Sequence, residues 1–198
     1  MRFIDHAFAI TVMVFLLGAF VGATLIVFSS TFREFSLTVL RTRMLSPMQT
    51  VAHLGDVAVF VAVFVNNLIP TVLSFAYPLA IAEINWTPPL SRHRLLFFLS
   101  AYTFIAAFLI GFFSLGAPLA TGWVLGGTNL FLSLISGARI HGPLEFGFVL
   151  LCIAEPLRIS WDPTDRGTLV KLVDDRTLLF VSIAGLFVAA AIEVFLGI

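Results

Sequence analysis

The residues of this chain that are able to do chemistry are a few polar side chains set inside long apolar stretches. They are an asparagine pair, a histidine and two glutamates: Asn66, Asn67, His141, Glu145 and Glu155. His141 and Glu145 are four residues apart, a spacing that places both on one face of a helix and suits a proton relay, a gating pair or part of a metal site. Because two ligands do not define a metal site, we predict no bound metal.

A structural explanation exists for each of these residues. With Gly142 as the N-cap, Glu145 takes the third position of a helix, where a carboxylate accepts hydrogen bonds from free backbone amides. The pair Asn66-Asn67 is able to satisfy backbone groups freed by Pro70, or to line a polar path. Ionisable groups at membrane depth are costly and by default suggest a function. The sequence leaves both interpretations open.

The remaining glutamates in apolar stretches are expected to have separate roles. Glu155 lies ten residues after Glu145, about 15 Å further along a helix, and on another face. It is expected to form an ion pair near the membrane interface, where Arg158 follows it. Glu83 lies beside a polar loop and is expected to reach solvent, and Glu193 is the one charge in the last apolar run.

Sequence motifs typical of enzymes are not found. The chain has no HExxH, GxSxG, Walker loop, paired cysteines or GxGxxG after a strand. Four aspartates of the segment 161–177 alternate with basic residues, as on a solvated face rather than in a divalent-ion site; they are Asp162, Asp165, Asp174 and Asp175. We therefore predict a non-enzymatic protein without a cofactor.

Composition decides the broad class of the protein. Of the 198 residues, 60% are hydrophobic and 11% are charged, and the mean hydropathy is +1.07. Soluble domains are about 45–50% apolar and about 25% charged, so we predict an integral protein of the cell membrane with lipids as its surroundings. A formal net charge of +0 and a pI near 6.9 leave no basic surface for nucleic acid.

The apolar runs predict one all-α domain over residues 1–198 with five or six transmembrane helices, some of them broken or re-entrant. The helices are expected at about 7–28, 53–65, 67–84, 95–115, 119–136, 143–159 and 178–197. Residues 51–84 as one helix would be about 51 Å long, so a break is expected at Asn66-Asn67 and Pro70, with 53–65 interfacial or re-entrant. Glycines interrupt 119–136, which is predicted as a short span, with a re-entrant element as the alternative.

Small residues at a spacing of four predict close contacts between helices. Gly18 and Gly22 form one such pair, and Gly122 and Gly126 form another. In membrane helices this spacing lets a second helix approach closely. We expect these faces to pack helices, including those of neighbouring protomers in a homo-oligomer.

Counts of lysine and arginine predict the orientation. With six spans, both termini lie outside; with five, the N-terminus lies inside and the C-terminus outside. The charged segment 161–177 lies on the cytoplasmic side in both cases.

Three motifs occur in a fixed order: VFVNNLI at 63–69, GWVLG at 122–126 and HGPLEFGFVLLCIAEPLRIS at 141–160. In this order they resemble the stage II sporulation protein M family of integral membrane proteins. That family shows an Asn-Asn pair opening a membrane helix, a later Asn-Gly-x-x-x-Gly and an HGxxE element. The Asn66-Asn67 pair and His141-Gly142-x-x-Glu145 match in full, whereas Thr121 stands in place of the family's asparagine and Glu155-Pro156 in place of a small-residue patch.

The resemblance covers about residues 51–160 and implies an all-helical, multi-spanning, non-enzymatic protein. In spore formers the family implies a membrane complex with peptidoglycan-remodelling partners, a role that we do not transfer to this chain. We expect a structural or complex-organising component, a homo-oligomer with other membrane or envelope proteins as further partners. The alternative is a channel or transporter for ions or small solutes, with a polar path near Asn66, Asn67, His141 and Glu145.

Overall fold

The structure is a computed structural model that describes residues 2–40, 42, 50–84, 92–139, 141–161 and 177–196. Its elements are α1 (Arg2–Phe28), α2 (Ser30–Leu40), α4 (Asp56–Ile84), α5 (Arg92–Ile110), η2 (Gly111–Gly116), α6 (Ala117–Ala138), α7 (His141–Trp161) and α9 (Thr177–Leu196). Every one of these elements is helical, which confirms the predicted all-α class.

Four stretches are long and apolar enough to cross a membrane: His6–Phe28, Asp56–Pro78, Phe97–Gly137 and Thr177–Phe195. Large apolar side chains are exposed along them, among them Phe20, Val61, Ile105 and Phe187. Contiguous exposed apolar surface of this extent is unfavourable in water and favourable in lipid. The helices therefore have the composition and surface of a membrane protein.

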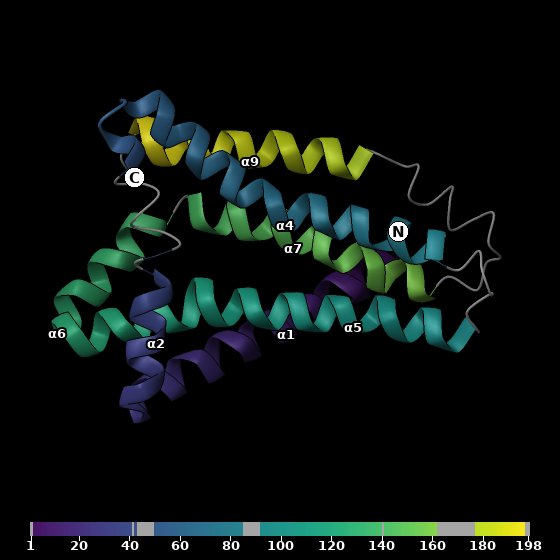
Figure 1. Cartoon of the computed structure of the whole chain (residues 1–198), viewed down its shortest axis with the longest axis horizontal. Coiled ribbons are helices and arrows are strands. Elements are labelled where there is room, and N and C mark those ends of the chain that lie inside the picture. The colour runs from purple at the N-terminus through teal and green to yellow at the C-terminus, as the bar shows by residue number, and fades with distance from the viewer. Residues whose placement is uncertain are drawn as a thin grey trace.

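The long helices run in alternating directions along one axis, and α7 is the helix that the others enclose (Figure 1). It packs against α1, α4, α5 and α9. This helix carries Glu145, Glu155 and Arg158, so the most charged of the long helices lies where it contacts lipid least. Such an arrangement is expected because charged groups in a membrane face the interior of a bundle.

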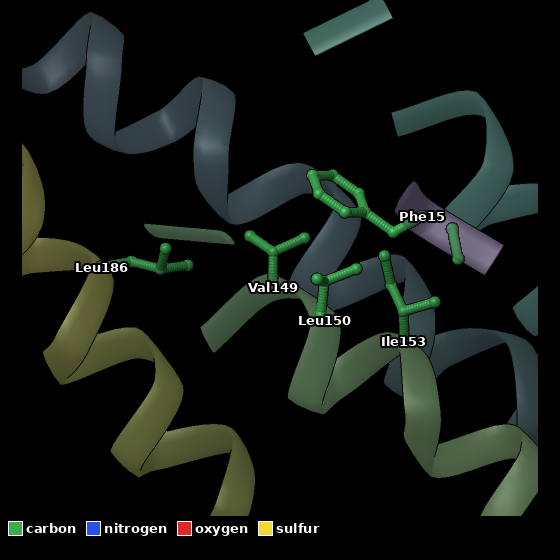
Figure 2. Close-up of a cluster of buried hydrophobic side chains, with 6 residues drawn as sticks. Phe15, Val149, Leu150, Ile153 and Leu186 are labelled. Atoms are coloured by element: carbon green, nitrogen blue, oxygen red, sulfur yellow. The ribbon is translucent and has the colours of Figure 1, made fainter. Parts of the chain in front are cut away.

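The main core lies where α1, α5, α7 and α9 meet. Figure 2 shows Phe15 from α1 and Leu186 from α9 converging on Val149, Leu150 and Ile153 of α7. Between helices in lipid the hydrophobic effect contributes little, so close van der Waals packing must hold this cluster together. The core fixes the rotation of α7 and hence the directions in which its polar residues point.

Close packing of α1 on α5 and η2 depends on glycine. A Cβ atom at Gly18 would overlap with the carbonyl oxygen of Phe108, and one at Gly22 would lie 2.9 Å from that of Phe112. Gly111 in turn meets the backbone of Phe15. The close approach that the sequence predicts for Gly18 and Gly22 is thus made within one chain rather than between protomers.

Helix α4 is continuous over Asp56–Ile84, with Pro70 and Pro78 inside it. The predicted break at Asn66-Asn67 and Pro70, with separate helices over 53–65 and 67–84, is therefore wrong. A proline removes one backbone donor and bends a helix, and packed neighbours make this tolerable. The chain turns instead just before the helix, at Gly55, whose φ of 93° suits glycine.

The α6 segment folds back on itself, so the continuous span predicted over 119–136 is wrong. Gly127 has φ 61° and ψ −154°, a combination that is essentially confined to glycine. On either side of it the two halves pack together: Trp123 and Phe131 have ring centroids 5.5 Å apart, and Gly122 faces Leu134. Figure 1 shows this helical hairpin at one end of the bundle.

Candidate functional site

A cluster of polar side chains lies where α4, α7 and α9 meet. It consists of Asn66 and Asn67 on α4, Glu145 on α7 and Glu193 on α9, and we call it the carboxyl cluster. The three helices pack pairwise against one another. Residues that are 126 positions apart in the sequence are therefore brought into one site.

Asn67 is the central member of the carboxyl cluster. It is 8% exposed, and its side-chain oxygen accepts a hydrogen bond from the amide of Asn66 over 3.4 Å. Its side chain also hydrogen-bonds the carboxyl group of Glu145. An amide is suited to this position because it carries both an acceptor oxygen and two donor hydrogens.

Two carboxyl groups share this site. Glu145 and Glu193 are both half-buried, and the charge of Glu193 acts on Glu145. Like charges repel strongly where little water screens them. A proton bound by either group would remove that repulsion.

Proline places free backbone groups beside the cluster. In a helix the amide four residues ahead bonds each carbonyl, and Pro70 has no amide hydrogen to give to the carbonyl of Asn66. Pro78 has the same effect on the carbonyl of Ser74. The carbonyl of Asn66 is thus a further acceptor at the level of the carboxyl cluster.

The N-cap explanation of Glu145 is wrong. Helix α7 begins at His141, so Gly142 lies within the helix and Glu145 is not its third residue. Its carboxyl group bonds Asn67 of another helix. The side chain of His141 lies outside the described residues, as do the side chain of Glu83 and the four aspartates of 162–175.

A second set of polar side chains continues along the interior of the bundle. The hydroxyl groups of Ser74 and Tyr102 are 3.1 Å apart, and the ring of Tyr102 stacks on that of Tyr77 with centroids 4.4 Å apart. The thiol of Cys152 interacts with Ser182 of α9. These residues lie about two turns of α7 beyond Glu145.

Glu155 lies at the far half of α7 and forms the expected ion pair with Arg158. The Arg158 Nε donates to Glu155 Oε2 over 2.8 Å, and Nη2 donates to Oε1. Nearby, the hydroxyls of Ser100 and Ser160 are 3.2 Å apart. Polar groups therefore recur along α7 from Glu145 to Ser160.

Metal binding finds no support within the described ranges. No group of three histidine, cysteine, aspartate or glutamate residues gathers there. Zinc sites use three or four such ligands that are oriented by further hydrogen bonds, whereas Mg²⁺ is often bound through one or two carboxylates. The carboxyl cluster itself offers two carboxyl groups and two amides.

Sequence reasoning singled out Asn66, Asn67 and Glu145 but did not place Glu193 with them. The sequence signal for Glu193 was its position as a carboxylate within an otherwise apolar helix. Its partners were not predictable, because no spacing rule relates α9 to α4 or α7.

No family model, curated protein or solved structure matches the chain. The resemblance to the stage II sporulation protein M family thus stays a prediction from the two motifs Asn66-Asn67 and His141-Gly142-x-x-Glu145. In the folded chain these motifs meet, because Asn67 hydrogen-bonds Glu145. The two motifs are far apart in the sequence but contribute to one site in the fold.

Proposed function

We propose that the chain is an integral protein of the cell membrane with five spanning helices, α1, α4, α5, α7 and α9, and with α6 as a re-entrant hairpin. The alternating directions of the five helices support this arrangement. α7 carries Glu145, Glu155 and Arg158, and its enclosure by the other four helices makes these charges acceptable in a span.

We propose further that the protein moves protons or small cations across the membrane. The single observation that carries this proposal is the carboxyl cluster, in which Glu145 and Glu193 share one site with the buried Asn67. Membrane proteins keep ionisable groups in their interior at a cost, chiefly where the groups bind or relay charge. A purely structural contact is achieved more cheaply by neutral residues.

Exchange at the site requires that the bond between Asn67 and Glu145 open and close. Pro70 and Pro78 lie inside α4, one turn and three turns beyond the Asn66-Asn67 pair. Each removes a backbone hydrogen bond and so lowers the cost of bending α4. Bending of α4 against α7 would expose the carboxyl cluster and then enclose it again.

The experiment is ion flux through the purified protein in liposomes, followed with a pH-sensitive dye and with Na⁺, K⁺ and Mg²⁺ indicators. We expect the native chain to conduct, Glu145→Gln to abolish flux and Asn66→Ala to reduce it. Glu34→Gln is the matched control, because Glu34 is an exposed glutamate on α2. Size-exclusion profiles and thermal unfolding of each variant establish that it folds.

Two results would count against transport: native protein that is silent towards all four ions, or flux that Glu145→Gln leaves unchanged. Either would favour the second candidate, a non-enzymatic structural or complex-organising component. Such a component would form a homo-oligomer and would bind other envelope proteins as further partners. The interhelical hydrogen bonds support this candidate, since the bond from Thr103 to the carbonyl of Ile153 is buried and 2.8 Å long. Chemical cross-linking in intact membranes would then test self-association and identify partners.

A further inference from the structure

Two buried hydroxyl groups on the inner faces of α4 and α9 lack a hydrogen bond of ordinary geometry among the described residues. Thr71 and Ser182 are both 0% exposed, and neither oxygen meets an acceptor or donor of ordinary geometry among the described residues. The thiol of Cys152 interacts with Ser182, but a thiol is only a weak hydrogen-bond partner. A hydroxyl left without a partner in an apolar interior costs about 1–3 kcal/mol, so such groups normally bind water or another polar group.

Other hydroxyl residues in the same bundle form a hydrogen bond within their own helix that Thr71 and Ser182 do not form. Thr11, Thr24, Thr38, Thr42 and Ser74 each donate to the carbonyl four residues earlier. That bond is the ordinary solution for a hydroxyl in an apolar helix. Its absence at Thr71 and Ser182 indicates that these oxygens are directed to something else.

The location of the two hydroxyls links the polar groups already described. Thr71 lies one turn after Asn67 and about one turn before Ser74, and all three are buried on one face of α4. Ser182 lies beside Cys152, two turns along α7 from Glu145. Between the carboxyl cluster and Tyr102, a polar group thus occurs at about every turn.

We propose that Thr71 and Ser182 bind water molecules that continue a path from the carboxyl cluster towards Tyr102, and that the proton is the species that moves along it. This inference rests on the proposed transport function and specifies its substrate. A proton leaving the Glu145 carboxyl passes to the water at Thr71, which gives one of its own protons to the next hydroxyl or water. No group is oxidised or reduced, and reorientation of the hydroxyls restores the starting arrangement.

A metal cation does not suit the same path. Metal cations need several oxygen ligands at each resting position, six or more for Ca²⁺ and near-octahedral geometry for Mg²⁺. Beyond the carboxyl cluster, the described side chains along the path are isolated hydroxyl groups and a single thiol, that of Cys152. Single hydroxyls with water are sufficient for a proton, because it is passed on rather than coordinated.

The test is proton flux in liposomes under an imposed membrane potential, comparing Thr71→Val with the native chain. We expect flux to fall by about tenfold, the factor that a barrier raised by one lost hydrogen bond gives. Thr71→Ser, which keeps the hydroxyl, should restore flux. Thr121→Val is the matched control, because Thr121 is also buried and unpartnered but lies on α6, next to Ala120 of the α1–α6 contact.

The outcomes separate this inference from the proposed function. If Glu145→Gln stops flux but Thr71→Val conducts like the native chain, transport stands and the water path is wrong. If the native chain carries Na⁺ or K⁺ but no protons, the proton is not the substrate. If nothing is carried at all, the transport function itself fails, and a structure in lipid that shows Thr71 dry or bonded to its own helix overturns the bound water as well.

Discussion

At the scale of single residues, Thr103 differs from most hydroxyl residues of the bundle. Its hydroxyl donates to the carbonyl of Ile153 on α7 over 2.8 Å, from a fully buried position on α5. Pro156 lies three residues further along α7 and removes the amide that would bond the carbonyl of Cys152. Thr103 therefore ties α5 to the part of α7 whose own hydrogen bonding is interrupted.

We predict that Thr103→Val lowers the free energy of unfolding by about 0.6 kcal/mol, and by no more than about 1.7 kcal/mol, the range for hydrogen bonds between membrane helices. Valine keeps the shape of threonine but cannot donate. The measurement is equilibrium unfolding in mixed micelles. Thr11→Val is the matched control, since Thr11 is equally buried and bonds only Ala7 of its own helix; an equal loss in both variants would contradict the interhelical role.

The carboxyl cluster shows what residue types reveal and what they conceal. Asn66, Asn67, Glu145 and Glu193 are each recognisable because such side chains are costly in an apolar helix. Their association is not recognisable, because it depends on the rotation and tilt of α4, α7 and α9. Rotation and tilt are set by the packing of core residues such as Leu186 and Val149. No repeating pattern in the sequence shows which of these residues contact one another across helices.

At the scale of elements, glycine sets the distance between α1 and the α5–η2 segment. A Cβ atom at Gly111 would overlap with the carbonyl oxygen of Phe15. Backbone cannot yield as a flexible side chain does, so the helices would have to separate. The same contact is repeated at Gly116, which faces the carbonyl of Ala19.

We predict that Gly111→Ala lowers the free energy of unfolding by about 1–3 kcal/mol, as overpacking does. Gly147→Ala is the matched control, because Gly147 is a helical glycine with nothing within 4 Å of an added Cβ. There the better helix propensity of alanine should leave stability unchanged or raise it by up to about 1 kcal/mol. Thermal unfolding in lipid nanodiscs measures both, and equal stability of the two variants would show that α1 is not held by this contact.

The limits of prediction at this scale follow from glycine and proline. Apolar runs located α1, α5, α7 and α9 because about twenty apolar residues suffice to define a span. At α4 the same rules placed a break at Pro70, whereas the chain breaks at Gly55. The local sequence does not show whether neighbouring helices will stabilise a helix that is bent at a proline. In α6 the turn at Gly127 depends on contacts between Trp123 and Phe131, which only the folded hairpin brings together.

At the scale of the whole molecule, the five spans proposed above would place the ends of the chain on opposite sides of the membrane. The start of α1, the end of α4, both ends of the α7–α9 connection and the start of α5 lie at one end of the bundle (Figure 1). The helix ends there carry Arg2, Arg92, Arg94 and Arg158, and the sequence that connects α7 to α9 adds three more of the 11 basic residues: Arg166, Lys171 and Arg176. Of the remaining basic residues, Arg33 and Arg139 lie in or next to α2 and α6, and Arg41 and Arg43 follow α2 in the sequence.

Because the more basic side of a membrane protein faces the cytoplasm, we predict that the N-terminus and the segment 162–176 are cytoplasmic and that the C-terminus is outside. Fusions of a reporter that is active only outside the cytoplasm, and of one that fluoresces only inside, measure this directly. The first reporter should be active after residue 198 and inactive within 162–176, with the second giving the opposite pattern. The same side for both positions would require α9 not to cross, and would place Glu193 and the carboxyl cluster at a membrane surface, where two carboxylates are cheap and no longer indicate transport.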